Sequence, residues 1–464
     1  MMIMKSNLMI LGFLVGILSA RGAFIQPGEL LHDPTAKEWK SLEQYDGNMT
    51  RSDFECRLNE IFDPSGSLSP YLKVTDNGFT VFASTNRIIP LATVSFSPAF
   101  KTACGERKSL PVASPIPSPS PESNSLFGSL FSWLSSPVAS PNPSPDPSAT
   151  RSSNTPLTGL RVVIEPADIG GAWASMEDRS TFYPGFGRIQ EGDLNLSVSK
   201  ALSSRLKQLG AEVYVTRESM EPVSGLTVPE VEEVVPEVLA HRSYLLSKTF
   251  NSRTENVRSS SPMYQKVAAE VLLTKNLEAR ARGQKTREAI HPDITIVLQF
   301  DATSARRRNN LPRTNRNILF VEGAYTPREI SNDPRQRLRL LTKLCQNVTP
   351  VEIEVAKAIS RHLVAATGFP PVLYGNSRIT RSIAGDPYVV ARNILLNREH
   401  DGAVVVTEPY FMNQPETLLR LLAGDYDGIR VIAGNPHISI YREYAGAVAD
   451  GLREVYGKNN QSHF

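Results

Sequence analysis

Acidic side chains and one amide lie at intervals along the sequence after residue 160, each at a place where it could take part in chemistry. Asp168, Gln299 with Asp301, and Glu408 follow short apolar runs, and Glu191 stands just before a run with helical spacing. Carboxylates gathered in one place can bind a metal ion or transfer protons as general acids and bases. Each of these residues alone is more often a helix cap or the partner of an arginine. The prediction of a carboxylate-lined site therefore depends on their coming together.

The apolar runs before these residues predict the strands of an α/β domain. The runs cover residues 161–165, 212–216, 294–298 and 403–407. Between the first two, the apolar residues from Leu194 to Leu209 recur at the spacing of one helix face. A strand, a helix and a strand in succession form a parallel pair with a right-handed crossover. We therefore expect a central, mostly parallel sheet with helices on both faces over residues 159–458, with the acidic residues at the carboxyl ends of the strands, where such sheets bind ligands.

Five segments in this region resemble, in the same order, the zinc-dependent N-acetylmuramoyl-L-alanine amidases. The segments are residues 164–171 (IEPADIGG), 191–196 (EGDLNL), 208–217 (QLGAEVYVTR), 297–302 (VLQFDA) and 408–416 (EPYFMNQPE). The second is nearly the Glu-Lys-Asp-Leu-Asn-Leu of that family, and the last is similar to its Glu-Gly-Gly-Phe-Leu-Ser-Asn-Pro-Glu. The resemblance implies the cell-wall amidase fold and an enzyme that cleaves the bond between N-acetylmuramic acid and L-alanine in peptidoglycan.

The resemblance also implies roles for the acidic residues. These amidases hold zinc through a histidine, a glutamate and a second histidine, and a further glutamate is the general base. Glu191 matches the ligand glutamate and Glu408 the catalytic one, whereas the two histidine positions are Asp168 and Gln299. A shift of the alignment by two residues puts Asp301 in place of Gln299. Zinc is therefore the cofactor expected from the family, with an altered set of ligands.

Two residues near these segments are candidates for binding the substrate. Asn413 lies in the last segment, and Arg306 belongs to a run of three arginines beside the expected site. A triple arginine is also common in solvated turns. Of the seven histidines, His437 alone stands where it could face the site, and no His-Glu-His set is visible.

Two functions remain open on these residues. Retention of Glu191 and Glu408 favours a metal-dependent amidase, whereas loss of both histidines favours a catalytically degenerate protein that binds peptidoglycan or a cell-envelope partner. A serine or cysteine hydrolase has little support, because no serine or cysteine stands in a nucleophile-elbow context.

The rest of the chain divides into segments of different composition. Residues 1–22 have the charged start, short apolar core and small residues of a signal peptide, which predicts export to the periplasm or cell envelope and membrane contact only if the segment stays uncleaved. Residues 24–108 read as a small α+β domain, and 109–158 as a linker dominated by proline and serine. Residues 218–289 form a helical insertion. In some amidases an inserted helix covers the active site, and Glu230, Glu232 or Glu233 could then reach a metal; a solvated helical flap is the alternative.

Composition excludes several classes of protein. The net charge of +3, from 50 basic and 47 acidic residues, argues against a dedicated nucleic-acid binder. Three cysteines exclude a disulfide-dense scaffold and any four-cysteine metal site. In an exported protein Cys56 and Cys104 could form a disulfide, which would leave Cys345 unpaired and buried.

Overall fold

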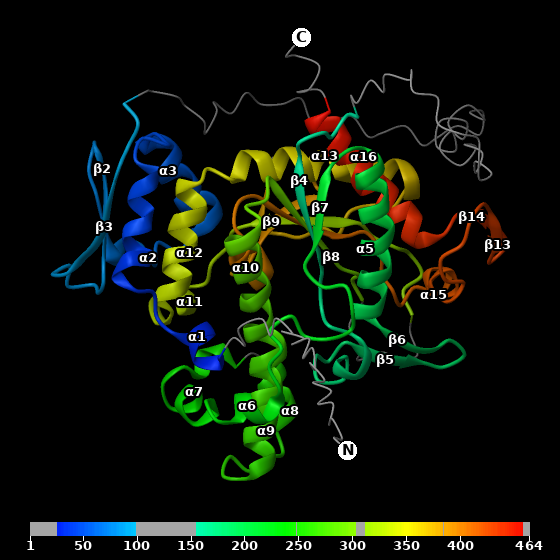
Figure 1. Cartoon of the computed structure of the whole chain (residues 1–464), viewed down its shortest axis with the longest axis horizontal. Coiled ribbons are helices and arrows are strands. Elements are labelled where there is room, and N and C mark those ends of the chain that lie inside the picture. The colour runs from blue at the N-terminus through cyan, green and yellow to red at the C-terminus, as the bar shows by residue number, and fades with distance from the viewer. Residues whose placement is uncertain (1–25, 99–154, 247, 303–310, 384, 458–464) are drawn as a thin grey trace, which may run out of the picture.

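The computed structural model describes residues 26–98, 155–246, 248–302, 311–383 and 385–457. A seven-stranded sheet in the order β10–β11–β9–β12–β8–β4–β7 forms its centre (Figure 1). Its strands are β4 (Arg161–Pro166), β7 (Glu212–Val215), β8 (Ile294–Leu298), β9 (Ile318–Glu322), β10 (Thr380–Ser382), β11 (Val389–Arg392) and β12 (Val404–Glu408). The expected strands β4, β7, β8 and β12 are mutually parallel, and β9–β12 and β10–β11 are the antiparallel pairs. The prediction of a mostly parallel sheet is confirmed.

Helices cover both faces of this sheet, as expected. On one face α5 (Glu191–Gln208), α13 (Thr349–Thr367) and α16 (Ile440–Tyr456) pack on one another and share one core with the strands. The opposite face carries a smaller apolar cluster with Val297, Phe320 and Val404, against which α14 (Leu395–Glu399) lies. Runs of β-branched residues in β8 and β12 are buried along their whole length, which is typical of strands covered on both faces.

The N-terminal region is α+β, but it does not have a core of its own. It contains α1 (Pro27–Leu31), α2 (Ala36–Lys40), α3 (Arg51–Arg57) and the antiparallel strands β1 (Leu72–Val74), β2 (Gly78–Phe82) and β3 (Pro90–Ser95). Its aromatic side chains Phe54, Phe62 and Phe79 share one apolar cluster with Tyr325 and with α12 (Pro334–Cys345) of the main domain. This region is therefore packed onto the sheet domain through a common core.

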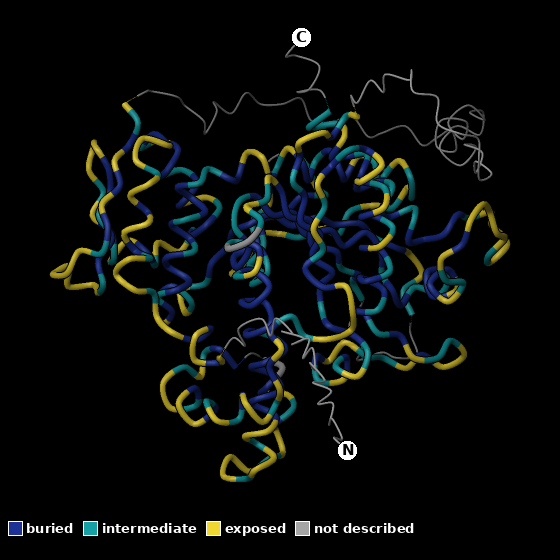
Figure 2. The backbone as a smooth tube through the Cα atoms, in the orientation of Figure 1, coloured by how far each residue is buried: buried dark blue, intermediate teal, exposed yellow. Residues whose placement is uncertain are grey.

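The helical insertion forms a lobe beside the sheet (Figure 1). Its helices are α6 (Val228–Glu232), α7 (Val235–His241), α8 (Lys248–Thr254), α9 (Pro262–Leu272), the π-helical turn η6 (Leu273–Leu277) and α10 (Glu278–Ala289). Together with Leu30 and Leu31 of α1 they enclose a separate apolar cluster. The tips of the lobe are exposed, whereas the α9–η6–α10 segment is buried where it approaches the sheet (Figure 2).

The remaining elements connect the sheet to its covering helices. They are the hairpin β5 (Ser180–Tyr183) and β6 (Gly187–Gln190), α11 (Pro327–Asn332), α15 (Pro415–Leu422), and the hairpin β13 (Arg430–Ile432) and β14 (Asn435–His437). Over the described ranges, no helix has both the length and the apolar composition needed to cross a membrane.

Several sequence predictions fall outside the described residues: the signal peptide 1–22, most of the linker 109–158, Cys104 and Arg306. Cys56 is disulfide-bonded, and Cys345 is free and buried as expected. Burial raises the pKa of the Cys345 thiol to about 12, which leaves it protonated and unreactive at neutral pH.

Candidate functional site

The four predicted carboxylates lie at the carboxyl edge of the sheet, each fixed by a different element. Asp168 lies two residues after β4, Glu191 is the first residue of α5, and Glu408 is the last residue of β12. Asp301 follows β8, and its backbone N–H donates to Tyr410 O beyond β12 at 2.9 Å. Asp168 and Glu408 each act on the pKa of Glu191, and Asp301 acts on that of Glu408. The structure therefore brings all four into one electrostatic cluster.

Glycines allow the Asp168 loop to pack against the start of α5. A Cβ on Gly192 would lie 2.4 Å from Gly170 N, so only glycine allows this approach. Gly170 has φ of 82°, in the left-handed region that glycine adopts without strain. The N–H of Gly171 donates to Asp193 Oδ1 at 2.7 Å across the same contact. The glycine pair after β4 thus packs directly against the Glu-Gly-Asp segment at the start of α5.

Side chains from other elements bind the exposed backbone groups of the same loop. The carboxylate of Glu177 accepts hydrogen bonds from the N–H groups of Ile169 and Gly170 at 2.7 and 3.1 Å. On the carbonyl side, Asn195 Nδ2 donates to Ala167 O at 2.8 Å, and Arg282 Nη2 donates to Asp168 O at 3.3 Å. The position of Asp168 is thereby fixed by α5 and by the helical insertion together.

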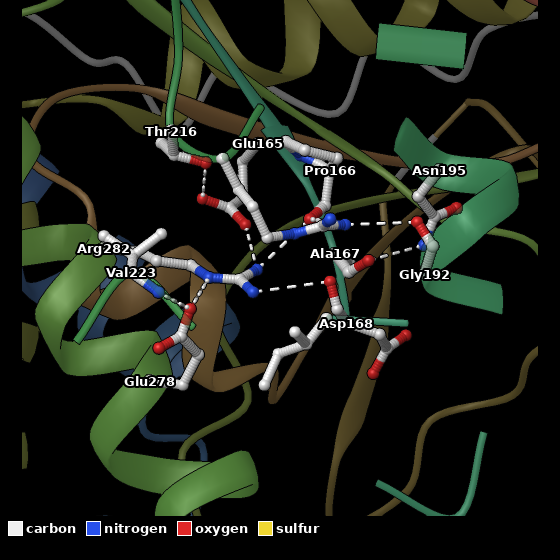
Figure 3. A network of polar contacts seen from close by, with 12 residues as sticks. Glu165, Pro166, Ala167, Asp168, Gly192, Asn195, Thr216, Val223, Glu278 and Arg282 are labelled. Carbon is white, nitrogen blue, oxygen red and sulfur yellow. Dashed lines mark hydrogen bonds and ion pairs between the residues drawn. The ribbon is translucent and has the colours of Figure 1, made fainter. Parts of the chain in front are cut away.

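Arg282 of α10 is the centre of a buried network behind the site (Figure 3). Its guanidinium donates to Glu165 Oε1 at 2.5 Å and to Glu278 Oε1 at 2.7 Å, and the side chain is only 2% exposed. Burial would raise the pKa of Glu165, but Arg282 and His400 outweigh it and hold that pKa at about 2. Glu278 in turn accepts from the N–H of Val223 at 2.8 Å. This network attaches the insertion to the end of β4, next to Asp168.

Cationic side chains lie directly against the acidic cluster. Arg179 Nε is 3.5 Å from Asp168 Oδ1, and Arg179 Nη1 is 3.4 Å from Glu191 Oε2. Lys275 Nζ, from the π-helical turn η6, is 3.7 Å from Asp168 Oδ1. The backbone carbonyl of Arg179 accepts from the Glu191 N–H at 3.2 Å, which ties the arginine to the start of α5. One guanidinium therefore bridges the residues at two of the expected ligand positions.

The carboxylates of the cluster differ in their protonation. Burial raises the pKa of Glu191 to about 8 despite the opposing charge of Arg179, and burial together with the Asp301 charge raises that of Glu408 to about 8. Burial and the Asp168 charge raise the pKa of Glu177 to about 7. Burial also acts on Asp168, but the charges of Arg179 and Lys275 outweigh it and lower its pKa. At neutral pH the cluster therefore holds one firmly ionised carboxylate beside two that retain their protons.

These residues do not fit a zinc ion. Among the described residues, no group of three or more His, Cys, Asp or Glu side chains is arranged to hold a metal. Arg179 already pairs with Asp168 and Glu191, and the two positions where the sequence resemblance implies imidazole ligands, 168 and 299, hold an aspartate and a glutamine instead. Gln299 lies at the end of β8, where its N–H donates to Thr407 O at 3.0 Å and its carbonyl accepts from the Tyr444 hydroxyl at 3.2 Å.

The other candidates occupy different places. Asn413 is buried in the loop between β12 and α15. His437 Nε2 lies 2.8 Å from Glu416 Oε1 at the β13–β14 hairpin. Glu230 caps α6 by accepting from the N–H of Thr227 at 2.7 Å. The insertion thus contacts Asp168 through Lys275 and Arg282, whereas Glu230, one of the three glutamates that the sequence suggested, caps its own helix.

Sequence reasoning missed Arg179, Lys275 and Arg392, the cations of the site. Lys275 carried a signal, since it is the only basic residue in the largely apolar stretch 267–277. A lysine inside a buried helical run needs a partner, and Asp168 is that partner. Nothing in the sequence around Arg179 or Arg392 indicates that either residue belongs to the site.

Comparison with known proteins leaves the family of the chain open. No protein-family model and no curated protein matches the sequence. Among solved structures it is similar to the N-acetylmuramoyl-L-alanine amidase AmiC2 of Nostoc punctiforme, with 13% identity, a TM-score of 0.31, and coverage of 64% of this chain and 97% of that one. It is also similar to the amidase Ami1 of Mycobacterium smegmatis, with 12% identity, a TM-score of 0.33, and coverage of 65% and 99%. For Cwp6 from Clostridium difficile the identity is 10%, the TM-score 0.32, and the match spans 64% of this chain and 29% of that chain.

Proposed function

We propose that this chain is an exported cell-envelope protein whose amidase-like domain binds the stem peptides of peptidoglycan without cleaving them. The observation that carries the proposal is the pairing of Arg179 with both Asp168 and Glu191. A guanidinium between these carboxylates supplies the positive charge that a metal ion would supply, but it cannot acidify a water molecule as zinc does.

The chemistry of the cluster suits a peptide ligand. Protonated Glu191 and Glu408 can donate hydrogen bonds to amide carbonyls, and ionised Asp168 can accept from amide N–H groups. Peptidoglycan is proposed as the source of that peptide because of the five sequence segments shared with cell-wall amidases. Export is supported by the pattern of residues 1–22, and the disulfide at Cys56 is consistent with an oxidising compartment.

A second candidate is a metal-dependent N-acetylmuramoyl-L-alanine amidase. It is favoured by the proximity of Glu191 and Glu408, which match the ligand and catalytic glutamates, since the charge of Glu408 contributes to the raised pKa of Glu191. In that function Asp168, Glu191 and Gln299, with Asp301 as the alternative, would be the ligands, and Glu408 the general base. Asn413 and Arg306 would contact substrate. A metal would first have to displace Arg179 from Asp168 and Glu191.

Co-sedimentation of the purified full chain with isolated peptidoglycan sacculi tests the proposal. We expect the wild type to pellet with the sacculi equally well with and without a metal chelator. Arg179→Gln should weaken binding, whereas Arg188→Gln, which removes an exposed arginine from the neighbouring β5–β6 hairpin, should leave it unchanged. Absence of binding by the wild type, or binding that depends on added zinc, would overturn the proposal.

A further inference from the structure

Arg392 is held in a fixed orientation at the edge of the acidic cluster. It is the last residue of β11, and its guanidinium carbon lies 4.5 Å from the centre of the Phe320 ring and 5.7 Å from that of Tyr374. Phe320 is fully buried in β9, the parallel neighbour of β11. A planar guanidinium stacked on aromatic rings loses little freedom when it binds a ligand.

Arg392 lies farther from its acidic partner than Arg179 and Lys275 lie from theirs. Its Nη1 lies 4.0 Å from Glu408 Oε2, which is too long for a hydrogen bond. By contrast, Arg179 lies within 3.5 Å of two carboxylates. Within the residues that the structure describes, the Arg392 guanidinium donates no hydrogen bond, and its side chain is 30% exposed. Its N–H groups are therefore available to a ligand beside Glu408.

The surrounding charges select the class of anion. A guanidinium presents parallel N–H donors that match the two oxygens of a carboxylate. Asp301 also interacts electrostatically with Arg392, so its negative charge would repel a doubly charged phosphate more strongly than a singly charged carboxylate. A carboxylate-bearing ligand is the anion that this position accepts best.

We propose that Arg392 recognises a carboxylate of the bound peptide, so that the site prefers acidic stem peptides over those whose carboxylates are amidated. The inference rests on the proposed function, because it names the part of the ligand that contacts β11. Its structural basis is the combination of the aromatic support, the long Glu408 contact and the partly exposed guanidinium.

Calorimetric titration with two soluble muramyl peptides tests this proposal, one with free carboxylates and one with the same carboxylates amidated. We expect the wild type to bind the free acid about tenfold more tightly, the effect of one charge-assisted hydrogen-bonding pair. Arg392→Gln should bind both peptides with the weaker affinity, and Arg392→Lys should recover part of the preference. Inorganic phosphate should compete poorly.

Arg381→Gln is the matched control. Arg381 of β10 pairs with Ala391 next to Arg392, so its side chain points to the opposite face of the sheet. This variant should keep the full preference. Equal affinity of the wild type for both peptides, an Arg392→Gln variant that still discriminates, or strong competition by phosphate would overturn the carboxylate assignment while leaving peptidoglycan binding intact. If the wild type bound neither peptide, the proposed function would fail and this inference with it.

Discussion

Arg179 Nη1 lies 3.4 Å from Glu191 Oε2. The Nε atom of the same guanidinium lies 3.5 Å from Asp168 Oδ1, so one cation is shared by two acidic side chains of the cluster. The charges of Glu191 and Asp168 in turn raise the pKa of Arg179 above its ordinary value. The positive charge between Asp168 and Glu191 is thus supplied by a side chain of the protein, Arg179, so that substitution of this residue should alter what the site binds.

Zinc affinity should depend on Arg179 as well as on whether positions 168 and 299 supply imidazole ligands. Asp168→His with Gln299→His supplies imidazole ligands, but Arg179 still pairs with Glu191. We expect this double variant to bind zinc weakly and the triple variant that adds Arg179→Ala to bind it much more tightly, as measured by calorimetry. Near-stoichiometric zinc in the purified wild type would contradict this account of the site.

The buried network of Arg282 should be a major source of stability. Its guanidinium pairs with Glu165 and Glu278 in a place that water does not reach. Arg282→Met leaves both carboxylates buried without their cationic partner in α10, and loss of one member of such a group costs about 3–5 kcal/mol of unfolding free energy. Urea unfolding measures this effect.

Arg188→Met provides the control for that measurement, because Arg188 is exposed on β6. Exposed substitutions of this kind change stability by about 0.5 kcal/mol or less. If Arg282→Met were no more destabilising than Arg188→Met, the insertion would not be held to β4 in the way described.

Stability should fall as the pH rises from about 4.5 to about 8. In the folded protein Glu191 and Glu408 have pKa values of about 8, against an ordinary value of 4.5. Between these values the folded state keeps protons that the unfolded chain has released, so each pH unit gained favours unfolding until both states are ionised. Urea unfolding of the wild type at several pH values should show this slope. In the double variant Glu191→Gln, Glu408→Gln the unfolding free energy should depend less steeply on pH. An unchanged dependence would show that other titrating groups cause the effect.

The close approach of Gly192 to Gly170 predicts a position that accepts no side chain. A Cβ at Gly192 would lie 2.4 Å from Gly170 N and 2.7 Å from Gly170 Cα, so Gly192→Ala must push the Asp168 loop away from α5. We expect a loss of about 1–3 kcal/mol. Gly446→Ala in α16 is the control, because its Cβ meets nothing within 4 Å. It should be neutral or stabilise the helix by up to about 1 kcal/mol. Thermal melts distinguish the two outcomes, and equal melting temperatures would contradict the contact.

The carboxylates of the site were predictable from the sequence because their positions follow from local rules. Asp168 and Glu408 stand at the ends of apolar strands, and parallel strands bring such ends to one edge. The burial of the α5 face that carries Val198 and Leu202 was predictable in the same way, from the helical spacing of its apolar residues.

The cationic residues of the site could not be predicted from the sequence, because their positions depend on contacts between segments that are far apart in the chain. Lys275 reaches Asp168 only because the Arg282 network fixes α10 against β4. Arg392 is positioned by the pairing of β11 with β9, and none of the five segments singled out in the sequence includes either strand. The shared core of the N-terminal region depends on the apolar face of α12, whose partner no local pattern identifies.

Mass spectrometry of peptidoglycan incubated with the purified full chain, with and without added zinc, tests the central claim most directly. The account predicts that the protein pellets with the sacculi while the stem peptides stay attached to N-acetylmuramic acid under both conditions. Time-dependent release of peptides with a free L-alanine amino terminus, abolished in Glu408→Gln, would contradict it and establish the amidase instead.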